Sequence, residues 1–404
     1  MIQPLEKLKS YIEKDQFAGY DPYDALNSPL LSGLSFGNKY LRIAFTQGLK
    51  RLPANLRPLF LVPKDYNPKG LGLFLWGYAK LYSVKKNAEY LVQIEKILGL
   101  LDGCKTSMLL DSSLRGNDKR WGGNDSAELD TGLRRYDGRA GHGWGYNFDW
   151  QSRAFFVPKY TPTVVNSSFI GHALLDTFTF TGLSKAREMA LPIGNFILHG
   201  LHRHQENGTI CFSYTPIDHY FVHNANLLGA SLLIRLFKVT EKKEYRDTAL
   251  AALAYSMKHQ HPDGSWFYAE KDISHWIDSF HTGFNLQAIR YFLDLGFAEE
   301  YRPQYEEGVR FYADNFFLAD GTPKYYHDRV YPLDIHSPAQ AVVFFSGMGK
   351  EYEELTNKIL NWMIENMQGP NGAFYFQKHK YYTNKIPYMR WGQAWAYHAL
   401  TEYL

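Results

Sequence analysis

The stretch DSFHTGFNLQAIRYFLDL (278–295), followed after a short turn by EEYRPQYEEGVRFYADNFF (299–317), decides the fold of this chain. The first segment is apolar around most of its circumference, which is typical of a helix buried on all sides. The second is amphipathic, with an apolar stripe opposite a charged face. Together they predict a helical hairpin that pairs an inner helix with an outer one.

The same pairing recurs along the chain. Five further segments have the character of an inner helix: GLGLFLWGYAKLY (70–82), NSSFIGHALLDTFTF (166–180), HNANLLGASLLIRLF (223–237), IHSPAQAVVFF (335–345) and RWGQAWAYHALTEYL (390–404). Four further segments read as outer helices: VKKNAEYLVQIEKILGLL (84–101), LSKAREMALPIGNFILHGL (183–201), EKKEYRDTALAALAYSMKHQ (241–260) and EYEELTNKILNWMIENM (351–367). Six inner helices predict an all-α (α/α)6 toroid. The alternative is an open solenoid, and the nearly complete hairpins with aromatic-rich loops favour closure.

Four dipeptides mark the connections between helices in the second half of the chain. They are Asn207-Gly208, Asp263-Gly264, Asp320-Gly321 and Asn371-Gly372, and each is followed by aromatic residues. Glycine tolerates a positive φ, and Asn or Asp side chains bond their own backbone, so each dipeptide predicts a tight turn.

No stretch of the 404 residues is rich enough in Ser, Gly, Pro or charge to separate two domains. We therefore predict a single toroid domain over residues 1–404, because a repeat architecture can run this long. The period is broken once, by a long insert over residues 102–165 that is Gly-rich and carries charges of both signs. Long irregular loops are usually functional, and we expect this one to fold over one mouth of the toroid.

The composition indicates a large core and a cleft suited to sugars. Apolar residues make up 45% and aromatic residues 16%, including 30 Tyr. Tyr rings can fill a core, but their hydroxyls need polar partners, and sugar rings stack on aromatic faces. The net charge of +3 is too mild to predict a nucleic-acid partner. Cys104 and Cys211 match no metal or redox spacing, which predicts two free thiols.

The N-terminal sequence MIQPLEKLKSYIEKD has neither the apolar core nor the cleavage site of a signal peptide. No window of the chain is apolar over the length needed to span a bilayer. We therefore expect a cytoplasmic protein without an integral membrane segment. The sequence leaves the oligomeric state open.

Polar residues gather at the predicted starts of the inner helices. In a toroid these starts surround one mouth of the cavity, where free N–H groups and the helix dipole favour hydroxyls or a carboxylate. The residues at these positions are Asn166, His223, Asp278, His281, His336, Arg390 and Trp391. Asn166 and Asp278 can also be simple helix caps, and the histidines can be structural. No HxH or HExxH pair accompanies these histidines, so we predict no metal site and no cofactor.

The loops that lead into the inner helices are rich in Tyr and should form the rim of the cavity. We expect Tyr220, Tyr268, Tyr331 and Tyr388 among the residues of this rim. The insert segment GWGYNFDWQSRAFF (143–156) should add Asp149, Trp150 and Arg153 to the binding residues. The alternative for many of these residues is packing within the loops. No DxDD, phosphate-loop or GxSxG motif occurs, which argues against terpene cyclisation, nucleotide hydrolysis and serine-esterase chemistry.

With these features, the chain resembles a group of carbohydrate enzymes. WIDSFHTGFNLQAI (276–289) and turns such as DGSWFY (263–268) are similar to the (α/α)6 toroids of glucuronyl C5-epimerases, N-acylglucosamine 2-epimerases, polysaccharide lyases and several glycosidases. GYDPYDALNSPLL (19–31) and GWGYNFDWQSRAFF (143–156) resemble motifs of proteins encoded with bacterial surface-polysaccharide genes. The resemblance covers most of the chain. It implies the fold and a saccharide or glycan substrate, but not the reaction, because one fold hosts many chemistries.

The resemblance also implies two patterns of roles. In the C5-epimerases and lyases, cavity tyrosines carry protons and an arginine holds the uronate carboxylate, a pattern that the Tyr-rich rim and Arg390 match. In the 2-epimerases, histidines on inner helices take and return the proton, a pattern that His223, His281 and His336 match.

Three functions remain open from the sequence. The first is a sugar epimerase, of the uronate C5 type, or a related lyase, and the expected cytoplasmic location favours the epimerase because lyases act mostly outside the cell. The second is a glycoside hydrolase, which needs two carboxylates roughly 5 to 9.5 Å apart. Its candidates are Asp149, Asp218, Asp278 and Asp334. The third is a glycan-binding protein without catalysis.

Overall fold

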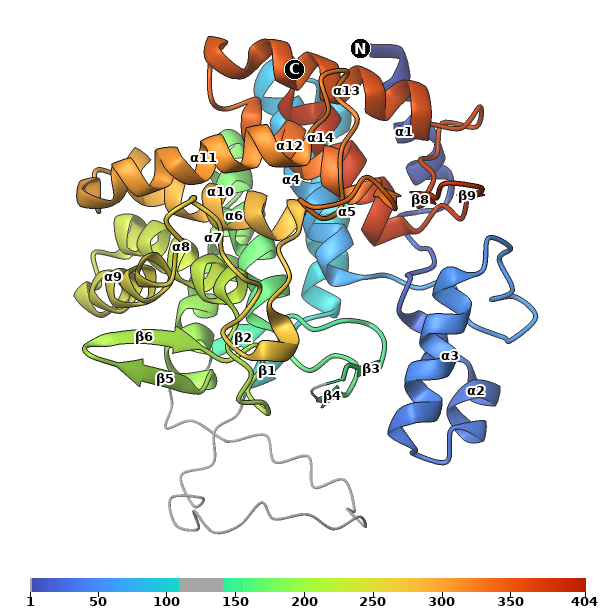
Figure 1. Cartoon of the computed structure of the whole chain (residues 1–404), viewed down its shortest axis with the longest axis horizontal. Helices are drawn as coiled ribbons and strands as arrows, with labels where there is room; N and C mark the ends of the chain where they lie inside the picture. The colour runs from blue at the N-terminus through green and yellow to red at the C-terminus, as the bar shows by residue number, and fades with distance from the viewer. Residues whose placement is uncertain (1, 109–140, 154) are drawn as a thin grey trace.

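The computed structural model describes residues 2–108, 141–153 and 155–404 (Figure 1). The central part of the predicted insert, residues 109–140, lies outside the described residues. The two flanks of the insert are described and belong to the folded body.

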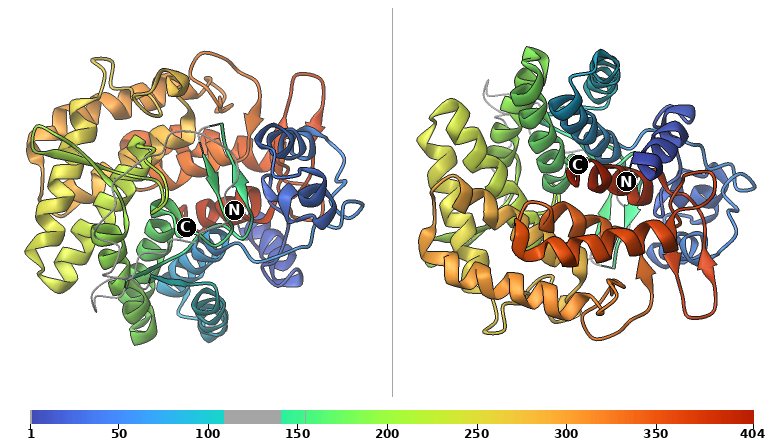
Figure 2. Two further views of the ribbon diagram at one scale, coloured as in Figure 1. Left: turned by 90° about the horizontal axis from the view of Figure 1, so that it is seen from below. Right: turned by 90° about the horizontal axis from the view of Figure 1, so that it is seen from above.

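Six helices form an inner ring, close to where the sequence predicts them. They are α4 (Pro68–Lys85), α6 (Val164–Thr181), α8 (His223–Thr240), α10 (Ser279–Asp294), α12 (His336–Phe345) and α14 (Trp395–Glu402), the last preceded by the π-helical segment η7 (Met389–Ala394). Each inner helix packs against the next, and α14 packs back against α4. The ring is therefore closed, and the predicted (α/α)6 toroid is confirmed (Figures 1 and 2).

The outer helices are α5 (Ala88–Gly103), α7 (Ser184–Asn195, continued by the π-helical segment η3, Phe196–Gly200), α9 (Lys243–Lys258), α11 (Arg302–Phe316), α13 (Glu353–Met367) and α1 (Ile2–Lys14). The last of these comes from the other end of the chain. Helix α1 packs against α14, and Gln368 donates its side-chain amide to the carbonyl of Pro4 at 2.9 Å. On the other side, the Tyr78 hydroxyl donates to Glu13 at 2.7 Å. The sixth hairpin is thus completed by the N-terminal helix, which the sequence pattern did not assign.

The remaining elements are short. The strands are β1 (Thr106–Met108), β2 (Gly141–Gly143), β3 (Trp150–Gln151), β4 (Phe156–Val157), β5 (Arg203–Glu206), β6 (Thr209–Phe212), β7 (Leu333–Asp334), β8 (Gln377–Lys378) and β9 (Thr383–Asn384). They form antiparallel pairs β1–β2, β3–β4 and β5–β6 and a three-stranded sheet β7–β8–β9. Single helical turns are η4 (Asp272–Ser274), η5 (Glu299–Tyr301) and η6 (Lys350–Tyr352). All four predicted turn glycines have a positive φ of 81–86°: Gly208, Gly264, Gly321 and Gly372.

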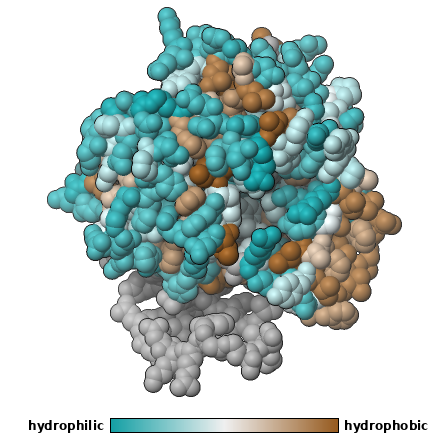
Figure 3. Space-filling view, viewed as in Figure 1, coloured by the Kyte–Doolittle hydropathy of each residue, from teal (hydrophilic) through white to brown (hydrophobic). Residues whose placement is uncertain are grey.

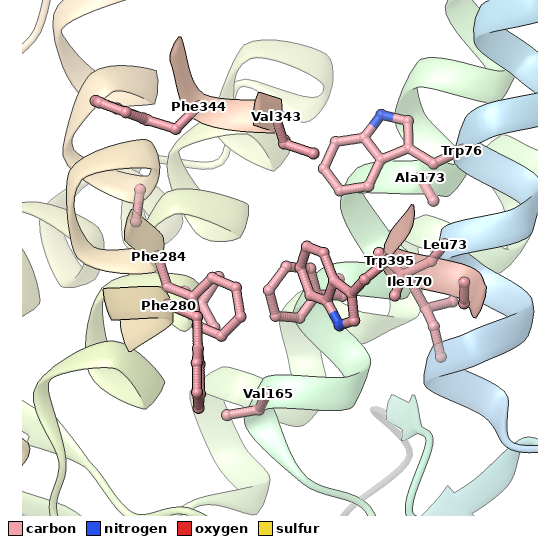
Figure 4. Close-up of a cluster of buried hydrophobic side chains, with 14 of the residues drawn as sticks. Leu73, Trp76, Val165, Ile170, Ala173, Phe280, Phe284, Val343, Phe344 and Trp395 are labelled. Atoms are coloured by element: carbon pink, nitrogen blue, oxygen red, sulfur yellow. The ribbon is translucent and has the colours of Figure 1, made fainter. Parts of the chain in front are cut away.

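Aromatic side chains fill the centre of the ring (Figure 4). The ring of Trp395 is fully buried and lies 5.3 Å from both Phe169 and Phe284, between ring centroids. These three residues come from α14, α6 and α10, so the core joins walls that are far apart in sequence. Burial of large aromatic rings is the main stabilising contribution here. This packed layer forms the base on which the polar cavity rests.

A small lobe lies beside the ring, at the right of Figure 1. It contains η1 (Asp24–Asn27), α2 (Pro29–Leu34) and α3 (Lys39–Arg51). The lobe has its own core of Ala25, Leu31, Leu49 and Val62. Buried Arg57 joins the lobe to the ring, because its Nε donates to Asp24 at 2.7 Å and its Nη1 donates to the Tyr388 hydroxyl at 2.8 Å.

The C-terminal flank of the insert is fixed to the same face of the ring. Asn147 donates to Asp65 at 3.1 Å and accepts from Asn67 at 2.9 Å. The Trp144 indole donates to the carbonyl of Leu101 at 2.8 Å. This flank lies over the mouth of the toroid, as the sequence predicts. Among the described helices, none combines the length and the apolar character needed to cross a membrane.

Candidate active site

A cavity of about 380 Å³ opens at the mouth of the toroid where the inner helices begin. The insert flank contributes Tyr146, Phe148 and Trp150 to its wall, and α3 contributes Gln47, Lys50 and Arg51. Its other lining residues, from the inner-helix starts and the loops before them, are Tyr23, Lys69, Val165, Tyr214, Asn224, Tyr268, Trp276, Asp278, Phe280, His281, Phe284, Tyr325, Tyr326, His336, Arg390 and Trp391. The polar residues that the sequence predicts at the inner-helix starts divide into those that line this wall and those that do not.

Asp278 and His281 form a hydrogen-bonded pair on the cavity wall. Asp278 is the N-cap of α10, where one carboxylate oxygen accepts the backbone N–H of His281 at 3.0 Å. The other oxygen lies 2.7 Å from Nδ1 of the His281 ring. The His281 side chain is 23% exposed, whereas the Asp278 side chain is almost fully buried. The Asp278 carboxylate thus caps α10 and, with its other oxygen, orients the His281 imidazole.

Lys69 lies at the floor of the cavity, in the first turn of α4. Its Nζ stands 4.2 Å from the centroid of the Phe169 ring and 5.2 and 5.3 Å from those of Phe284 and Trp395. No carboxylate or other hydrogen-bond acceptor of the described residues is paired with this amine. Burial, reinforced by the charge of Arg390, lowers the pKa of Lys69 well below its ordinary value.

Lys69 and His281 come from opposite walls. Helix α4 is followed around the ring by α6, α8 and then α10, and in the other direction by α14, α12 and then α10. A ligand at the centre of the cavity would therefore meet the imidazole on one side and the amine from the other side.

Arg390 is held by Asp21 rather than left open to the cavity. Its Nε donates to one oxygen of Asp21 at 2.5 Å, and its Nη2 donates to the other at 2.8 Å. Both residues are about 97% buried, and the guanidinium also lies 5.2 Å from the centroids of Tyr146 and Trp391. Because Nε and Nη2 of Arg390 already donate to Asp21, the guanidinium offers only its remaining N–H groups to a ligand.

His336 lies deeper than His281. Both of its ring nitrogens are buried, and neither has a hydrogen-bond partner among the described residues. The ring stacks on Phe280 at 4.5 Å and meets the edge of Trp391 at 4.8 Å. Burial, together with the nearby charge of Lys69, lowers the pKa of His336 well below its ordinary value, so the ring is neutral. Trp391 is oriented by a hydrogen bond from its indole to Asp334 at 2.8 Å.

Several tyrosines of the predicted rim line the cavity. The Tyr268 ring stacks on Trp276 at 4.7 Å and lies 4.8 Å from the His281 ring. The hydroxyls of Tyr146 and Tyr214 are 3.2 Å apart and share a hydrogen bond. Burial raises the pKa of all three phenols, so each carries its proton at neutral pH.

Charge on the cavity wall is mainly positive. Lys50, Arg51 and Arg390 line it, and Lys69 adds a further positive charge when it is protonated, whereas Asp278 is the one carboxylate among the described lining residues. Asp21 lies behind the wall and balances Arg390. Lys50 donates to the Tyr23 hydroxyl at 2.7 Å, and its charge acts on the buried carboxylate of Asp334 behind the wall. This balance favours an anionic ligand.

Other predicted site residues lie outside the cavity wall. His223 is buried, with its Nε2 2.7 Å from Glu270 and its Nδ1 3.3 Å from Ser256. Asn166 is fully buried within α6. The Tyr220 hydroxyl bonds to Ser274, and the Tyr388 hydroxyl accepts from Arg57. The side chains of His223, Tyr220 and Tyr388 thus bond to neighbouring elements of the wall. Asn166 is not the cap of α6, which is Thr163, and its side-chain amide has no hydrogen-bond partner among the described residues.

Three predicted residues lie farther out. Tyr331 is 43% exposed and lines a separate surface hollow together with Tyr382. Asp149 accepts the backbone N–H of Lys159 at 2.8 Å and so shapes the insert flank. Arg153 is exposed on the same flank, and of the predicted insert residues only Trp150 reaches the described cavity wall.

Of the four aspartates considered for glycoside hydrolysis, one lines the cavity. Asp218 caps its own loop, accepting from the backbone of Tyr214, Thr215 and Tyr220. Asp334 is buried and accepts from Trp391, Gln377 and the backbone of His336. With Asp149 on the insert flank, Asp278 alone of the four lines the cavity.

Sequence reasoning missed Lys69, Tyr23, Lys50 and Tyr146. Lys69 carried a signal, because a cation in the first turn of a buried apolar helix is unfavourable near the positive end of the helix dipole. Tyr23 and Lys50 belong to the N-terminal lobe, whose sequence follows no repeat period. Tyr146 alternates with Phe148 and Trp150 in the insert. This pattern indicates a run of aromatic residues but not which of the rings faces the cavity.

No known protein family matches this sequence. No curated protein matches it either. Among solved structures, the chain is similar to cellobiose 2-epimerase from Spirochaeta thermophila, with 12% identity, a TM-score of 0.57 and coverage of 84% of this chain and 85% of that one. Cellobiose 2-epimerase from Bacillus thermoamylovorans gives 12% identity, a TM-score of 0.58 and coverage of 84% and 88%. A GH76 α-mannanase from Bacteroides thetaiotaomicron has 12% identity and a TM-score of 0.57, with coverage of 83% of this chain and 85% of that one.

These similarities establish the class of fold. The chain shares the toroidal arrangement of helices with these two epimerases and this mannanase, as the resemblance in sequence implied. The likeness concerns the arrangement of helices, so the chemistry has to be argued from the cavity itself.

Proposed function

We propose that this protein is an enzyme that abstracts a proton from an acidic saccharide and returns one, which makes it an epimerase of the uronate type, with a lyase as its close relative in chemistry. One observation carries the proposal. The Asp278–His281 pair opens into a cavity whose other charged lining residues are cations.

His281 is the proposed base. With Nδ1 bonded to the Asp278 carboxylate, the proton of the neutral ring stays on Nδ1, and Nε2 is free to accept another. The same carboxylate stabilises the imidazolium that forms. A positioned base of this kind contributes roughly a hundredfold to ten-thousandfold in rate.

Lys69 is the proposed group that holds the substrate's carboxylate. Arg390 was expected in this role from the sequence, but its fork is engaged by Asp21. An amine that has no counter-ion, in a cage of aromatic rings, gains most from an incoming anion, because the cage shields the pair from water. When a proton leaves the carbon beside the carboxylate, the negative charge spreads onto the carboxylate oxygens. Lys69 then stabilises that charge where it develops.

Inversion of a carbon also requires a proton on the opposite face. The Tyr146–Tyr214 pair is the proposed donor, because both hydroxyls line the cavity and both carry their protons at neutral pH. Hydrogen bonding within the pair stabilises the phenolate left after transfer. A lyase would instead use the proton to expel the leaving group at the neighbouring carbon.

The rival functions have less support. Glycoside hydrolysis through an acid and a second carboxylate needs two such groups across the sugar ring. Asp278 is the single carboxylate that the described residues contribute to the wall. A purely binding role leaves the oriented Asp278–His281 pair without an explanation.

The test is proton exchange in D2O. Wild-type protein is incubated with D-glucuronate and with glucuronate-containing oligosaccharides, and the sugars are followed by NMR. We expect deuterium at C5 with the glycosidic bonds intact. An unsaturated uronate would assign the lyase reaction, and new reducing ends without exchange would refute proton abstraction.

His281→Gln and the control His379→Gln, a half-buried histidine remote from the cavity, should be compared under the same conditions. Exchange should be lost in the first variant and retained in the second. Equal exchange in both variants would remove His281 from the mechanism.

A further inference from the structure

The lobe formed by residues 28–64 combines two unusual properties of its surface. These 37 residues, which leave out η1 with Asp24, hold six Lys or Arg and no Asp or Glu. Of the six, Arg57 is buried against Asp24 and Lys64 pairs with Asp15. The same 37 residues also hold eight of the 21 large hydrophobic side chains that are exposed in the described chain. Figure 3 shows the hydrophobic side chains gathered over α2 and α3, on the side where this lobe projects.

The apolar side chains are concentrated around the connection between the two helices. Phe36 is 85% exposed and Tyr40 is 77% exposed. Leu30 and Leu34, four residues apart on α2, share one face and are 47% and 56% exposed. Leu59, at 71%, extends this surface from the segment after α3. A contiguous apolar surface of this kind marks a site of interaction.

The lobe has a buried hydrophobic core of its own, so its exposed apolar side chains are additional to that core. Leu31, Leu49 and Val62 form the lobe's buried core. Ser28 caps α2 by accepting the backbone N–H of Leu31 at 3.0 Å, and Asn38 caps α3. The lobe is therefore a defined structure that presents Leu34 and Phe36 outward.

Charge identifies the occupant of this surface. Lys39 and Arg51 are exposed, and Arg42 is half-buried with its guanidinium 4.3 Å from the Phe156 ring centroid. A second copy of the chain would bring two such cationic lobes together, which like-charge repulsion opposes. Basic side chains around exposed Leu, Phe and Tyr are instead the pattern of a segment that lies in the interface of an anionic membrane.

We propose that the lobe of residues 28–64 docks this protein on a membrane surface that contains anionic lipids. Phe36, Leu34 and Tyr40 enter the headgroup boundary, and Lys39 and Arg42 bind lipid phosphates. Because α3 also lends Lys50 and Arg51 to the cavity wall, docking places the mouth of the toroid beside the bilayer. The inference rests on the lobe alone and stands independently of the proposed reaction.

The test is flotation of the full chain with vesicles. Vesicles of phosphatidylcholine alone are compared with vesicles of phosphatidylcholine and phosphatidylglycerol, at low and high salt. We expect binding to the anionic vesicles only, weakened by salt. Leu34→Ser with Phe36→Ser should lower the partition coefficient by at least about tenfold, because two large apolar side chains leave the interface. Lys39→Gln with Arg42→Gln should lower it severalfold.

The matched control is Val92→Ser, which removes an apolar side chain with 63% exposure from the outer helix α5. It should bind vesicles as the wild type does, and thermal unfolding should show that every variant folds. Failure of the wild type to float with the anionic vesicles, or equal flotation of the Leu34/Phe36 variant, would overturn the proposal. A concentration-dependent dimer in sedimentation velocity that the Leu34/Phe36 variant loses would also overturn it, since the surface would then belong to an interface between copies.

Discussion

Arg390 and Asp21 lie 369 positions apart in the chain and are joined by two hydrogen bonds, at 2.5 and 2.8 Å, in the wall of the cavity. The contact ties the segment before the N-terminal lobe to the start of the last inner helix. This ion pair, called the clasp below, therefore holds two distant parts of the chain together on the closed ring. It also fixes the position of the guanidinium against the rings of Tyr146, Phe148 and Trp391.

The first prediction concerns this clasp. Asp21→Asn leaves the buried guanidinium without its counter-ion, so the free energy of unfolding should fall by about 3–5 kcal/mol. Urea unfolding followed by tryptophan fluorescence measures the change. The control is Asp328→Asn, which breaks the exposed pair of Asp328 with Arg329 and should cost less than about 1 kcal/mol. Similar losses in the two variants would show that the clasp adds nothing beyond an ordinary surface pair.

The second prediction separates the two roles of Asp278. Asn is also a good N-cap, so Asp278→Asn can keep the bond from the backbone of His281 and should change the melting temperature little. The amide that replaces the second oxygen cannot accept from Nδ1 of His281. The ring then loses its orientation and tautomer, and exchange at C5 should slow by about a hundredfold to ten-thousandfold. Unchanged exchange in the folded variant would contradict the proposed pair.

The third prediction uses the direction of proton return. If Tyr146 and Tyr214 deliver the proton to the second face, Tyr146→Phe should leave deuterium wash-in from one epimer nearly intact. Formation of the other epimer should slow by at least about a hundredfold, because only that step needs the acid. Time-resolved NMR of exchange and of epimer ratio in one sample gives both rates. Equal slowing of the two rates would place Tyr146 in binding instead.

The fourth prediction follows from the lowered pKa of Lys69. A carboxylate bound beside the amine favours its charged form, so binding of D-glucuronate should take up a proton at pH values above the lowered pKa of Lys69 in the free protein and below its pKa in the complex. Titration calorimetry in buffers with different ionisation enthalpies counts that proton. Lys69→Met should lose both the uptake and most of the affinity, whereas Lys358→Met, on the outer helix α13, should behave as the wild type. Neutral D-glucose should give no uptake in any of them.

Much of the ring could be predicted from the sequence because its helices are periodic. Buried inner helices and amphipathic outer helices differ in pattern, and the four turn glycines occupy the positive-φ positions that Asx-Gly pairs indicate. The sixth outer helix could not be assigned, because α1 pairs with α14 from the opposite end of the chain. Local periodicity carries no information on which distant segments meet.

The site was harder to predict for the same reason. His281 and Asp278 lie three residues apart, so helix geometry alone brings them together. Arg390 was correctly expected at the start of an inner helix, but its partner Asp21 belongs to a segment without a repeat pattern. His223 occupies an equivalent helix start and yet turns toward Glu270, because its partners come from α9 (Ser256) and from the loop after α9 (Glu270), which have no counterpart among the described residues beside His281. Equivalent positions in a repeat thus receive different side-chain surroundings from their loops.

The last prediction concerns stability in acid. His398 is buried in α14, with its ring stacked on Trp76 at 4.5 Å, and burial lowers its pKa from 6.5 to about 3. The folded state therefore holds the ring neutral at pH values where the unfolded chain binds a proton. This stabilising contribution is complete above about pH 6.5 and is lost as the pH falls toward 3, by up to about 1.4 kcal/mol per pH unit. His172 and His336, whose pKa values burial also lowers, act in the same direction.

His398→Phe isolates this contribution, because the new ring can keep the stacking on Trp76 while the titrating group and its two unpartnered nitrogens are removed. Urea unfolding at a series of pH values from 7 to 4 should show a shallower loss of stability in the variant than in the wild type. The gap between the two should widen steadily below about pH 6.5, in proportion to the proton that the unfolded wild type takes up. The neighbouring Glu402 has a pKa raised by burial, which opposes the trend, and its carboxylate lies 3.8 Å from Nδ1 of His398. The comparison is therefore repeated with Glu402→Gln in both proteins, which removes this contribution. Parallel curves would mean that His398 is protonated in the folded ring, and that the layer of aromatic rings beneath the cavity admits a charge.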